Sequence, residues 1–256
     1  MDFSNKYIVG FAFLLCLVCS MAVSSLSVSL KERQEVNKLL DQRTNVLKVA
    51  GIVEPDAKLT KEEVDQFFTE IEELVIDRAE GRPDPAADPV AVDPPKDAKD
   101  LTKSVEAPAN LAKRTQVRRL PDQLEVYRVN VPGSECWVMP IWGNGLWSTL
   151  YGYLAVSLDA QEIVGITYYQ HKETPGLGGE VDNPTWKAQW PGKVAYDDNW
   201  TPRVTVVKAG TAVDSSYQVD GLSGATITGN GVSAMVELWL GPDGYGTFLK
   251  NQAASL

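Results

Sequence analysis

The chain has 256 residues, of which 44% are hydrophobic and 23% are charged, and its formal net charge is −10 at pH 7. This composition is typical of a folded protein with one sizeable domain and a smaller part, and it excludes a chain that is disordered throughout. The acidic balance, without a dense stripe of lysine and arginine, excludes nucleic acid as a partner.

Residues 7–30 contain no charged side chain. As an α-helix this stretch is about 36 Å long, enough to cross a hydrocarbon core of about 30 Å. A cleaved signal peptide is the alternative, but its apolar part has roughly 7–15 residues and ends at a small-x-small cleavage site. The longer run favours a permanent anchor, so we expect residues 1–30 to form a single transmembrane helix in contact with membrane lipid.

The charges beside this span bear on its orientation. Lys6 precedes it, whereas Lys31, Arg33 and Lys38 follow it closely. Taken literally, the positive-inside rule places the short amino-terminal tail outside the cytoplasm. Large domains cross the membrane largely regardless of such charges, so this count has little weight for the domain that follows.

The next part of the chain has the pattern of two amphipathic helices. Residues 31–50 place apolar residues among charges at helical spacing. A second helix is predicted after Thr60, because Thr60 and Glu63 have the spacing of a capping box. Its apolar face consists of Val64, Phe67, Phe68, Ile71 and Leu74. We interpret residues 31–80 as a helical stalk or docking segment.

Residues 81–110 are rich in proline and aspartate and poor in large apolar side chains. Such a composition buries too little apolar surface to order itself, which predicts a solvated linker or loop. The acidic excess leaves open a second interpretation, an acidic docking segment.

The remaining residues, 111–256, have the pattern of a domain. Short alternating stretches follow one another from about residue 120: LEVYRV, CWVMPIWG, STLYGYLAVSLD, EIVGITYYQH, PRVTVVKA and YQVDG. Their close spacing favours antiparallel pairing. Helical spacing returns near the carboxyl end with Val232, Met235, Val236, Trp239 and Leu240, before Gly241 and Pro242. The expected fold class is α+β: one N-terminal transmembrane helix, then a soluble domain with a mainly antiparallel sheet and flanking helices.

A turn of small residues, 220–228 with the sequence DGLSGATIT, lies directly before that last helix. Its backbone is open to close approach, and the free N–H groups of the helix end favour an anion, phosphate above all. The alternative is structural, with Thr228 or Asn230 serving as an N-cap. The spacing is neither a Walker A motif nor a dinucleotide fingerprint.

A second glycine-rich stretch, residues 173–179, has the sequence ETPGLGG. Its backbone can come close to a planar ring, with Leu177 over one face and amides of the loop as donors, while Glu173 caps or orients the loop. The loop residues predicted to contact a ligand are Glu173, Thr174, Gly176, Leu177 and Gly178. A rigid connection without a ligand is the alternative. Trp147 and Tyr151 are either ring contacts or core residues of a strand.

Cysteine and histidine are scarce. Three cysteines cannot form a disulfide framework, and Cys136 reads as a small buried hydrophobic residue. His171 is the single histidine, and we read it as a polar residue at a strand end. Since CxxC and HExxH spacings are absent from the sequence, we expect neither a metal site nor catalysis by a Ser-His-Asp or Cys-His arrangement.

The turn carries a resemblance. Asp220, Ser223, Gly224, Ala225 and Thr226 form Asp-x-x-Ser-Gly-Ala-Thr, which resembles the motif at which flavin transferases join FMN to threonine through a phosphoester. The acceptor of that motif is its last threonine, which carries over onto Thr226, with the hydroxyl of Thr228 as the nearby alternative. The resemblance therefore implies covalent FMN and a flavin transferase as a partner during maturation.

Two further stretches enlarge the resemblance. Residues 143–156 and 171–193 are similar to the FMN-binding domain found in the C subunits of the Na⁺-translocating NADH:quinone reductase, in which both precede the SGAT segment. The family implies an electron-carrying flavoprotein subunit in a multisubunit complex of the bacterial inner membrane, with the soluble domain in the periplasm. It implies that electrons arrive from an iron–sulfur centre and leave to the flavin of a membrane subunit, while other subunits bind NADH and quinone.

Two other functions remain open on the sequence. The flavoprotein subunit of the related ferredoxin:NAD oxidoreductase shares the ETPGLG and SGAT elements, although GLWSTLYGYLAV and the stretch from Trp186 to Trp190 favour the quinone reductase. A non-redox, membrane-anchored interaction module, in which the turn merely caps a helix, is the alternative from another class.

Overall fold

The computed structural model describes residues 4–212 and 214–256, so residues 1–3 of the predicted anchor and Val213 of the predicted domain lie outside the described residues. The chain forms two compact parts, one ending at Gln42 and the other spanning Arg43–Leu256. We describe each part by itself. Helix α1 (Asn5–Val49) supplies nearly all of the first part and, with its last two turns, enters the second.

Helix α1 runs without interruption where the sequence pattern predicts two helices. Residues 11–50 contain neither glycine nor proline, so nothing in the sequence breaks the helix between the apolar run and the amphipathic one. It ends at Val49, and Gly51, two residues later, has a φ of +70°. The amide of Gly51 donates to the Lys48 carbonyl and that of Ile52 to the Leu47 carbonyl, which forms a Schellman cap. Among the described residues, α1 is the one helix long and apolar enough to cross a membrane.

The helix predicted after Thr60 is shorter than expected. Thr60 and Glu63 form the predicted capping box at the start of α2 (Lys61–Phe67), and a 3₁₀ turn, η1 (Phe68–Glu70), follows. The prediction of helix beyond this point is wrong, because β1 (Ile71–Asp77) is a strand that pairs along its full length with β5 (Gln123–Val129). Sheet pairing thus overrides the helical pattern of the sequence.

The proline- and aspartate-rich segment is not a free linker but contains short elements. It forms β2 (Arg82–Pro83), the 3₁₀ turn η2 (Pro89–Ala91), α3 (Pro94–Asp97), β3 (Ser104–Glu106) and the start of α4 (Ala109–Thr115). Strand β2 pairs with the end of β1, and β3 pairs with β4 (Arg119–Pro121). The predicted solvated loop is therefore attached to the sheet.

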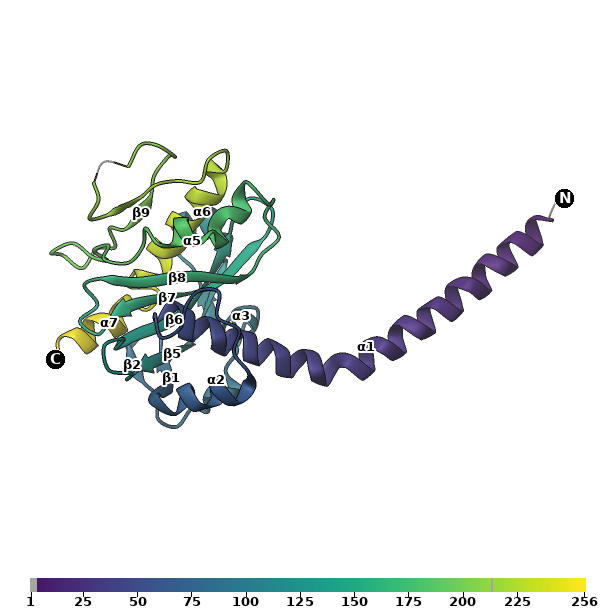
Figure 1. Cartoon of the computed structure of the whole chain (residues 1–256), viewed down its shortest axis with the longest axis horizontal. Coiled ribbons are helices and arrows are strands. Elements are labelled where there is room, and N and C mark those ends of the chain that lie inside the picture. The colour runs from purple at the N-terminus through teal and green to yellow at the C-terminus, as the bar shows by residue number, and fades with distance from the viewer. Residues whose placement is uncertain (1–3, 213) are drawn as a thin grey trace. The chain divides into compact units, whose positions relative to one another are not determined.

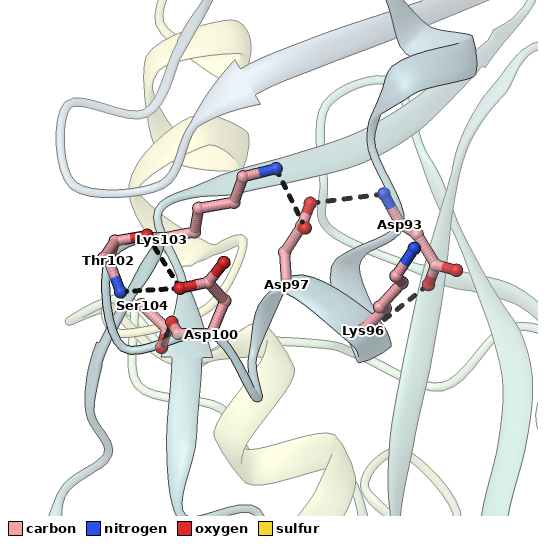
Figure 2. Close-up of polar contacts among 7 residues, drawn as sticks. All are labelled: Asp93, Lys96, Asp97, Asp100, Thr102, Lys103 and Ser104. Atoms are coloured by element: carbon pink, nitrogen blue, oxygen red, sulfur yellow. Dashed lines mark hydrogen bonds and ion pairs between the residues drawn. The ribbon is translucent and has the colours of Figure 1, made fainter.

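The aspartates of this segment stabilise its turns (Figure 2). The carboxylate of Asp93 accepts a hydrogen bond of 3.2 Å from the Lys96 amide, and that of Asp100 accepts one of 2.8 Å from the Thr102 amide. Asp97 pairs with the ammonium group of Lys103 at 3.2 Å. The segment has too few apolar side chains to order itself by burial. Hydrogen bonds from nearby backbone amides to the aspartate carboxylates stabilise its turns instead.

The domain is built on a six-stranded sheet with the order β2-β1-β5-β6-β7-β8 (Figure 1). Strands β6 (Cys136–Asn144), β7 (Thr149–Ser157) and β8 (Ile163–Gln170) continue from β5, and every neighbouring pair is antiparallel, as predicted. Strands β9 (Thr205–Val206) and β10 (Gln218–Val219) differ from the prediction, since they pair in parallel in a separate two-stranded sheet.

Helices cover both faces of the sheet. On one face, α6 (Thr226–Leu240) packs on β6, with Trp239 donating a 2.7 Å hydrogen bond to the Trp142 carbonyl, and α7 (Gly246–Ala253) brings Phe248 against Trp137. On the other face, the end of α1 meets Gly165 of β8, where a Cβ on the glycine would lie 2.6 Å from the Val49 carbonyl oxygen. The predicted carboxyl-terminal helix is thus confirmed, and it positions the turn before it.

Candidate functional site

Helix α6 begins at Thr226. Its N-cap residue is Ala225, and no side chain of the described residues caps the helix there. The structural alternative that the sequence leaves open, an N-cap at Thr228 or Asn230, is therefore wrong. The first-turn N–H groups of a helix lack partners within the helix, so this end offers donors and the positive end of the helix dipole.

The two candidate threonines of this turn differ in exposure. Thr226 is exposed, whereas Thr228 is only 1% exposed. The hydroxyl of Thr228 is also in use, because it donates a 2.8 Å hydrogen bond to the Glu173 carboxylate. Of the two threonines, only Thr226 is therefore exposed at the surface.

The turn before α6 is tied to its surroundings through Asp220. The carboxylate of Asp220 accepts hydrogen bonds from the amides of Gly210 at 2.7 Å and Thr211 at 3.3 Å. The carbonyl of Asp220 accepts a 2.8 Å bond from the indole N–H of Trp186. Trp186 is buried, so this contact fixes the start of the motif against the core. Ser223 and Gly224, by contrast, are exposed.

The glycine-rich loop at 173–179 lies against this turn. Gly224 has a φ of +72°, and a Cβ there would lie 2.9 Å from Cδ2 of Leu177. Leu177 is thus adjacent to the residues that precede Thr226. The carbonyl of Thr174 accepts hydrogen bonds from the amides of Leu177 at 3.1 Å and Gly179 at 3.0 Å. The sequence predicts that loop amides donate to a ligand, but these two amides are already used within the loop.

Glu173 is the centre of this arrangement. Its Oε1 accepts the amides of Trp147 at 2.9 Å and Ser148 at 3.1 Å, and its Oε2 accepts the Leu146 amide at 3.2 Å and the Thr228 hydroxyl at 2.8 Å. Glu173 is 5% exposed. Burial alone raises the pKa of this carboxyl, but the four hydrogen bonds outweigh it and hold the pKa below its ordinary value.

Two glycines make room for this carboxylate. A Cβ on Gly145 would lie 2.7 Å from Oε1 of Glu173. A Cβ on Gly178 would lie 2.6 Å from Oε2 of Glu173 and 2.6 Å from Oγ1 of Thr228. Real Cβ atoms do not approach that closely, so a side chain at either position would displace the Glu173 carboxylate from its present place.

Large apolar side chains are exposed around the same point. The exposed fractions are 69% for Trp147, 43% for Leu177 and 57% for Ile227. Trp147 therefore does not belong to the core, which is the alternative that the sequence leaves open for it. Tyr151 lies within β7, opposite Trp142, and packs against the core.

A hollow of about 430 Å³ adjoins the first turn of α6. Gly145, Ile227 and Asn230 line it together with Arg114, whose guanidinium group pairs with Glu237 at 2.6 Å. The sequence does not identify Arg114, because this residue reaches its place only through the packing of α4 beside α6.

His171 has a role that its sequence pattern does not reveal. Its Nδ1 accepts the Glu173 amide at 3.2 Å, and its Nε2 lies 2.7 Å from the Asp182 carboxylate. With Nδ1 as an acceptor, the ring proton belongs to Nε2, which donates to Asp182. His171 thus fixes the backbone of the residue that carries the central carboxylate, and only its position two residues before Glu173 signals this in the sequence.

The structure therefore brings together the three segments that the sequence singles out. An exposed threonine at an uncapped helix end, with Gly224, Trp147 and Leu177 exposed beside it, fits a phosphate-bearing planar cofactor. Residues 145–241 match the FMN-binding domain family. With the candidate span of α1, the chain is a membrane-associated FMN-binding protein.

Comparisons over the whole chain identify the family. The C subunit of the Na⁺-translocating NADH-quinone reductase of Yersinia pestis is 41% identical over 240 residues, which cover 93% of this chain and 89% of that protein. The corresponding protein of Pseudomonas aeruginosa is 41% identical over 247 residues, covering 94% and 93%. The chain belongs to the family of C subunits of the Na⁺-translocating NADH-quinone reductase.

Solved structures agree with this assignment. The crystal structure of Shewanella oneidensis NqrC has a TM-score of 0.73 and 30% identity, and the match covers 84% of this chain and 99% of that one. The crystal structure of the reductase C subunit from Parabacteroides distasonis has a TM-score of 0.67 and 29% identity, covering 86% and 96%.

Proposed function

We propose that this chain is the electron-carrying flavoprotein, the C subunit, of a membrane-bound, Na⁺-translocating NADH:quinone reductase, and that FMN is attached through a phosphoester to Thr226. The observation that carries the proposal is the exposed Thr226 at the uncapped start of α6, within a complete Asp-x-x-Ser-Gly-Ala-Thr motif. FMN supplies reversible one-electron chemistry when it is bound.

The helix end supports attachment at Thr226. A phosphoester retains one negative charge, and the start of a helix offers N–H donors and a positive dipole end to an anion beside its first residue. Thr228 is the weaker candidate acceptor, since its hydroxyl is buried and donates to Glu173. A covalent link also prevents the loss of the cofactor from a protein that faces dilute surroundings.

The other predicted contacts surround this point. Trp147 and Leu177 present apolar surface that suits the faces of a planar ring. Gly176, exposed and with a φ of +75°, keeps the loop backbone open to close approach, while Thr174 closes the loop through its carbonyl. Gly178 supports the loop from beneath, where it is buried against Glu173 and Thr228. These residues bind and orient the ring and exclude water from one side of it.

The partners follow from the family. We propose that a flavin transferase attaches the cofactor during maturation, that other subunits of the reductase bind NADH and quinone, and that α1 contacts lipid as a single span. Electrons arrive from an iron–sulfur centre and leave to the flavin of a membrane subunit, and the domain lies in the periplasm. The 41% identity to reductase C subunits favours this complex over the related ferredoxin:NAD oxidoreductase, and the FMN-binding domain match favours it over a non-redox interaction module.

In-gel flavin fluorescence after SDS denaturation tests the attachment. The full chain is co-expressed with a flavin transferase, beside Thr226→Ala and Thr228→Ser variants. We expect a fluorescent band in the wild type and in Thr228→Ser but not in Thr226→Ala. A band that survives in Thr226→Ala contradicts attachment at Thr226, and no band in the wild type with an active transferase contradicts covalent FMN.

Accessibility of an introduced cysteine tests the side of the membrane. Val90 is 90% exposed, so a Val90→Cys variant, made with Cys16 and Cys19 replaced by serine, reacts with a membrane-impermeant maleimide only where the reagent reaches the domain. The native Cys136 is fully buried, and burial raises the pKa of its thiol to about 12, so it stays unreactive. We expect labelling in intact spheroplasts, and labelling only after lysis contradicts the periplasmic placement.

A further inference from the structure

We propose that Glu173 is a positioning residue rather than a flavin ligand: its carboxylate fixes the turn of residues 146–148 to the first turn of α6, and so sets the position of Trp147 relative to Thr226. This inference rests on the proposed function, because it concerns the geometry of the site at which the flavin would be attached. Of the two roles expected from the sequence, orienting the loop and contacting the cofactor, it keeps the first, extends it to the hairpin and α6, and drops the second.

The hydrogen bonds of Glu173 leave it no capacity for a ligand. An ionised carboxylate has about four lone-pair sites, and the structure fills four of them. Three donors are the successive amides of residues 146–148, and the fourth is the hydroxyl of Thr228. Because Glu173 is buried beneath these groups, a cofactor at the surface meets Trp147 and Leu177 and not the carboxylate.

The arrangement requires a carboxylate at position 173. All four partners are donors, so the group between them must accept on both of its oxygens. A glutamine has nearly the same shape, but its NH₂ group would face either the amides of Trp147 and Ser148 or the amide of Leu146 and the Thr228 hydroxyl. The first orientation leaves two amides opposite a donor. The second leaves only the Leu146 amide opposite a donor, because the Thr228 hydroxyl can rotate to accept from the NH₂ group. Buried donors without an acceptor are costly, so the turn would move away from the loop.

The surroundings pack closely around this carboxylate. Gly145 and Gly178 flank it at distances that a methyl group could not occupy, and His171 holds the Glu173 amide from the other side. The contact joins segments that come from a hairpin, a loop and a helix. Thr228 is the third residue of α6, two residues after Thr226. Its bond to Glu173 therefore holds the turn that carries Trp147 and the helix end that carries Thr226 together as one unit.

The test uses the full chain in detergent, co-expressed with a flavin transferase, with Glu173→Gln as the main variant. Glu180→Gln is the matched control, since Glu180 directly follows the same loop and its carboxylate accepts one side-chain bond of 2.8 Å from Asn183. Two properties are measured: the amide hydrogen exchange of residues 146–148 in a Thr226→Ala background without flavin, and the visible circular dichroism of the attached flavin.

In Glu173→Gln we expect exchange of these amides to be about tenfold faster. We also expect the flavin to remain attached to Thr226 but to change its visible circular dichroism, because Trp147 is no longer held. Glu180→Gln should change neither property. Unchanged exchange and an unchanged spectrum in Glu173→Gln would overturn the positioning role. Loss of flavin from the wild type would instead contradict the proposed function, and the exchange measurement would still decide the role of Glu173.

A second pair of variants covers the case in which Glu173→Gln does not fold. Thr228→Val removes a single donor and keeps the three amide contacts, whereas Thr228→Ser keeps the hydroxyl. We expect Thr228→Val to change the flavin spectrum and Thr228→Ser to restore the wild-type spectrum. Identical spectra in Thr228→Val and the wild type would show that α6 is not coupled to the loop through this bond.

Discussion

The hydroxyl of Thr228 donates a hydrogen bond of 2.8 Å to the carboxylate of Glu173, and both side chains are buried. This bond joins residues that lie 55 positions apart in the sequence. It connects the glycine-rich loop to the helix that follows the turn of residues 220–225, so the two sequence features lie side by side. It also explains why two threonines separated by one residue have different surroundings, since Thr228 faces the loop and Thr226 faces solvent.

A substitution at Gly224 tests the contact between the turn and Leu177. Gly224 has a φ of +72°, and an added Cβ would lie 2.9 Å from Cδ2 of Leu177. We expect Gly224→Ala to lower the free energy of unfolding by about 1–2 kcal/mol because of the backbone conformation. We also expect Leu177 to be displaced, which should change the visible circular dichroism of the attached flavin.

Gly192→Ala separates these two effects. Gly192 has a similar φ of +77°, but no described atom outside its neighbourhood in the chain lies within 4 Å of an added Cβ. Both variants should lose similar stability in urea unfolding followed by tryptophan fluorescence. If Gly192→Ala alters the flavin spectrum as much as Gly224→Ala, the contact with Leu177 is not responsible for the change.

Sequence patterns predict a helix or strand correctly where the same face of the element is buried along its whole length. Helix α6 buries residues at a helical period, and β5 to β8 follow one another with short turns, so local pattern and tertiary structure agree. Residues 71–77 have an apolar spacing that fits both a helix and a strand, and pairing with β5 decides between them. No local pattern indicates such a partner, since β5 begins only at Gln123.

The sequence predicts which segments form the candidate site but not the hydrogen bonds that join these segments. Glycines and a threonine motif are visible in the sequence, whereas the donors that converge on Glu173 include backbone amides of a distant hairpin. Backbone groups have no sequence signature. The same reason hides Arg114 beside the first turn of α6, because its place depends on how α4 packs.

The charge of Glu173 predicts a dependence of stability on pH. The hydrogen bonds to its carboxylate hold its pKa below the ordinary value in the folded protein, although burial acts in the opposite direction. A depressed pKa stabilises the fold above the pKa of the unfolded chain, about 4.3, and this contribution is lost as the pH falls through the lower folded value. In urea titrations at pH 7, we expect the free energy of unfolding to be larger for the wild type than for Glu173→Gln. We expect this difference to shrink below about pH 4. A difference that is constant between pH 3 and pH 7 contradicts the assignment.

Glu125 predicts the opposite dependence. Its pKa is raised from 4.5 to about 7. Burial is the largest cause, and the nearby Glu73 and Asp93 also raise the pKa, whereas the hydrogen bond from Tyr127 and the charge of Arg43 lower it. A raised pKa means that the folded state holds the proton more tightly, so stability is full below about pH 4.5 and falls as the pH rises through 7.

Glu125→Gln removes this titration and still accepts the 2.6 Å bond from the Tyr127 hydroxyl. Because Glu125 is half-buried, we expect only about 1 kcal/mol of added stability at pH 8. The variant and the wild type should have equal free energies of unfolding near pH 4. A variant that is no more stable than the wild type at pH 8 shows that the carboxyl is already ionised at lower pH.

Arg43 fastens the last turns of α1 to the domain. Its guanidinium group lies 3.2 Å from the Asp65 carboxylate and 3.1 Å from that of Glu73, and it stacks at 4.6 Å over the ring of Phe68. A lysine supplies one charge but neither the planar fork nor the stacking surface. We expect Arg43→Lys to lower the free energy of unfolding by about 1–2 kcal/mol in urea titrations of the detergent-solubilised chain.

An exposed ion pair on the same helix is the control for this prediction. Lys31 and Glu35 lie 3.9 Å apart, and their side chains are 75% and 69% exposed. Pairs of this kind contribute little, so Lys31→Ala should change the free energy of unfolding by less than about 0.5 kcal/mol. If Arg43→Lys has as small an effect as Lys31→Ala, the two carboxylates and the ring of Phe68 do not hold α1, and the apolar contacts of Val46 and Leu47 account for its packing.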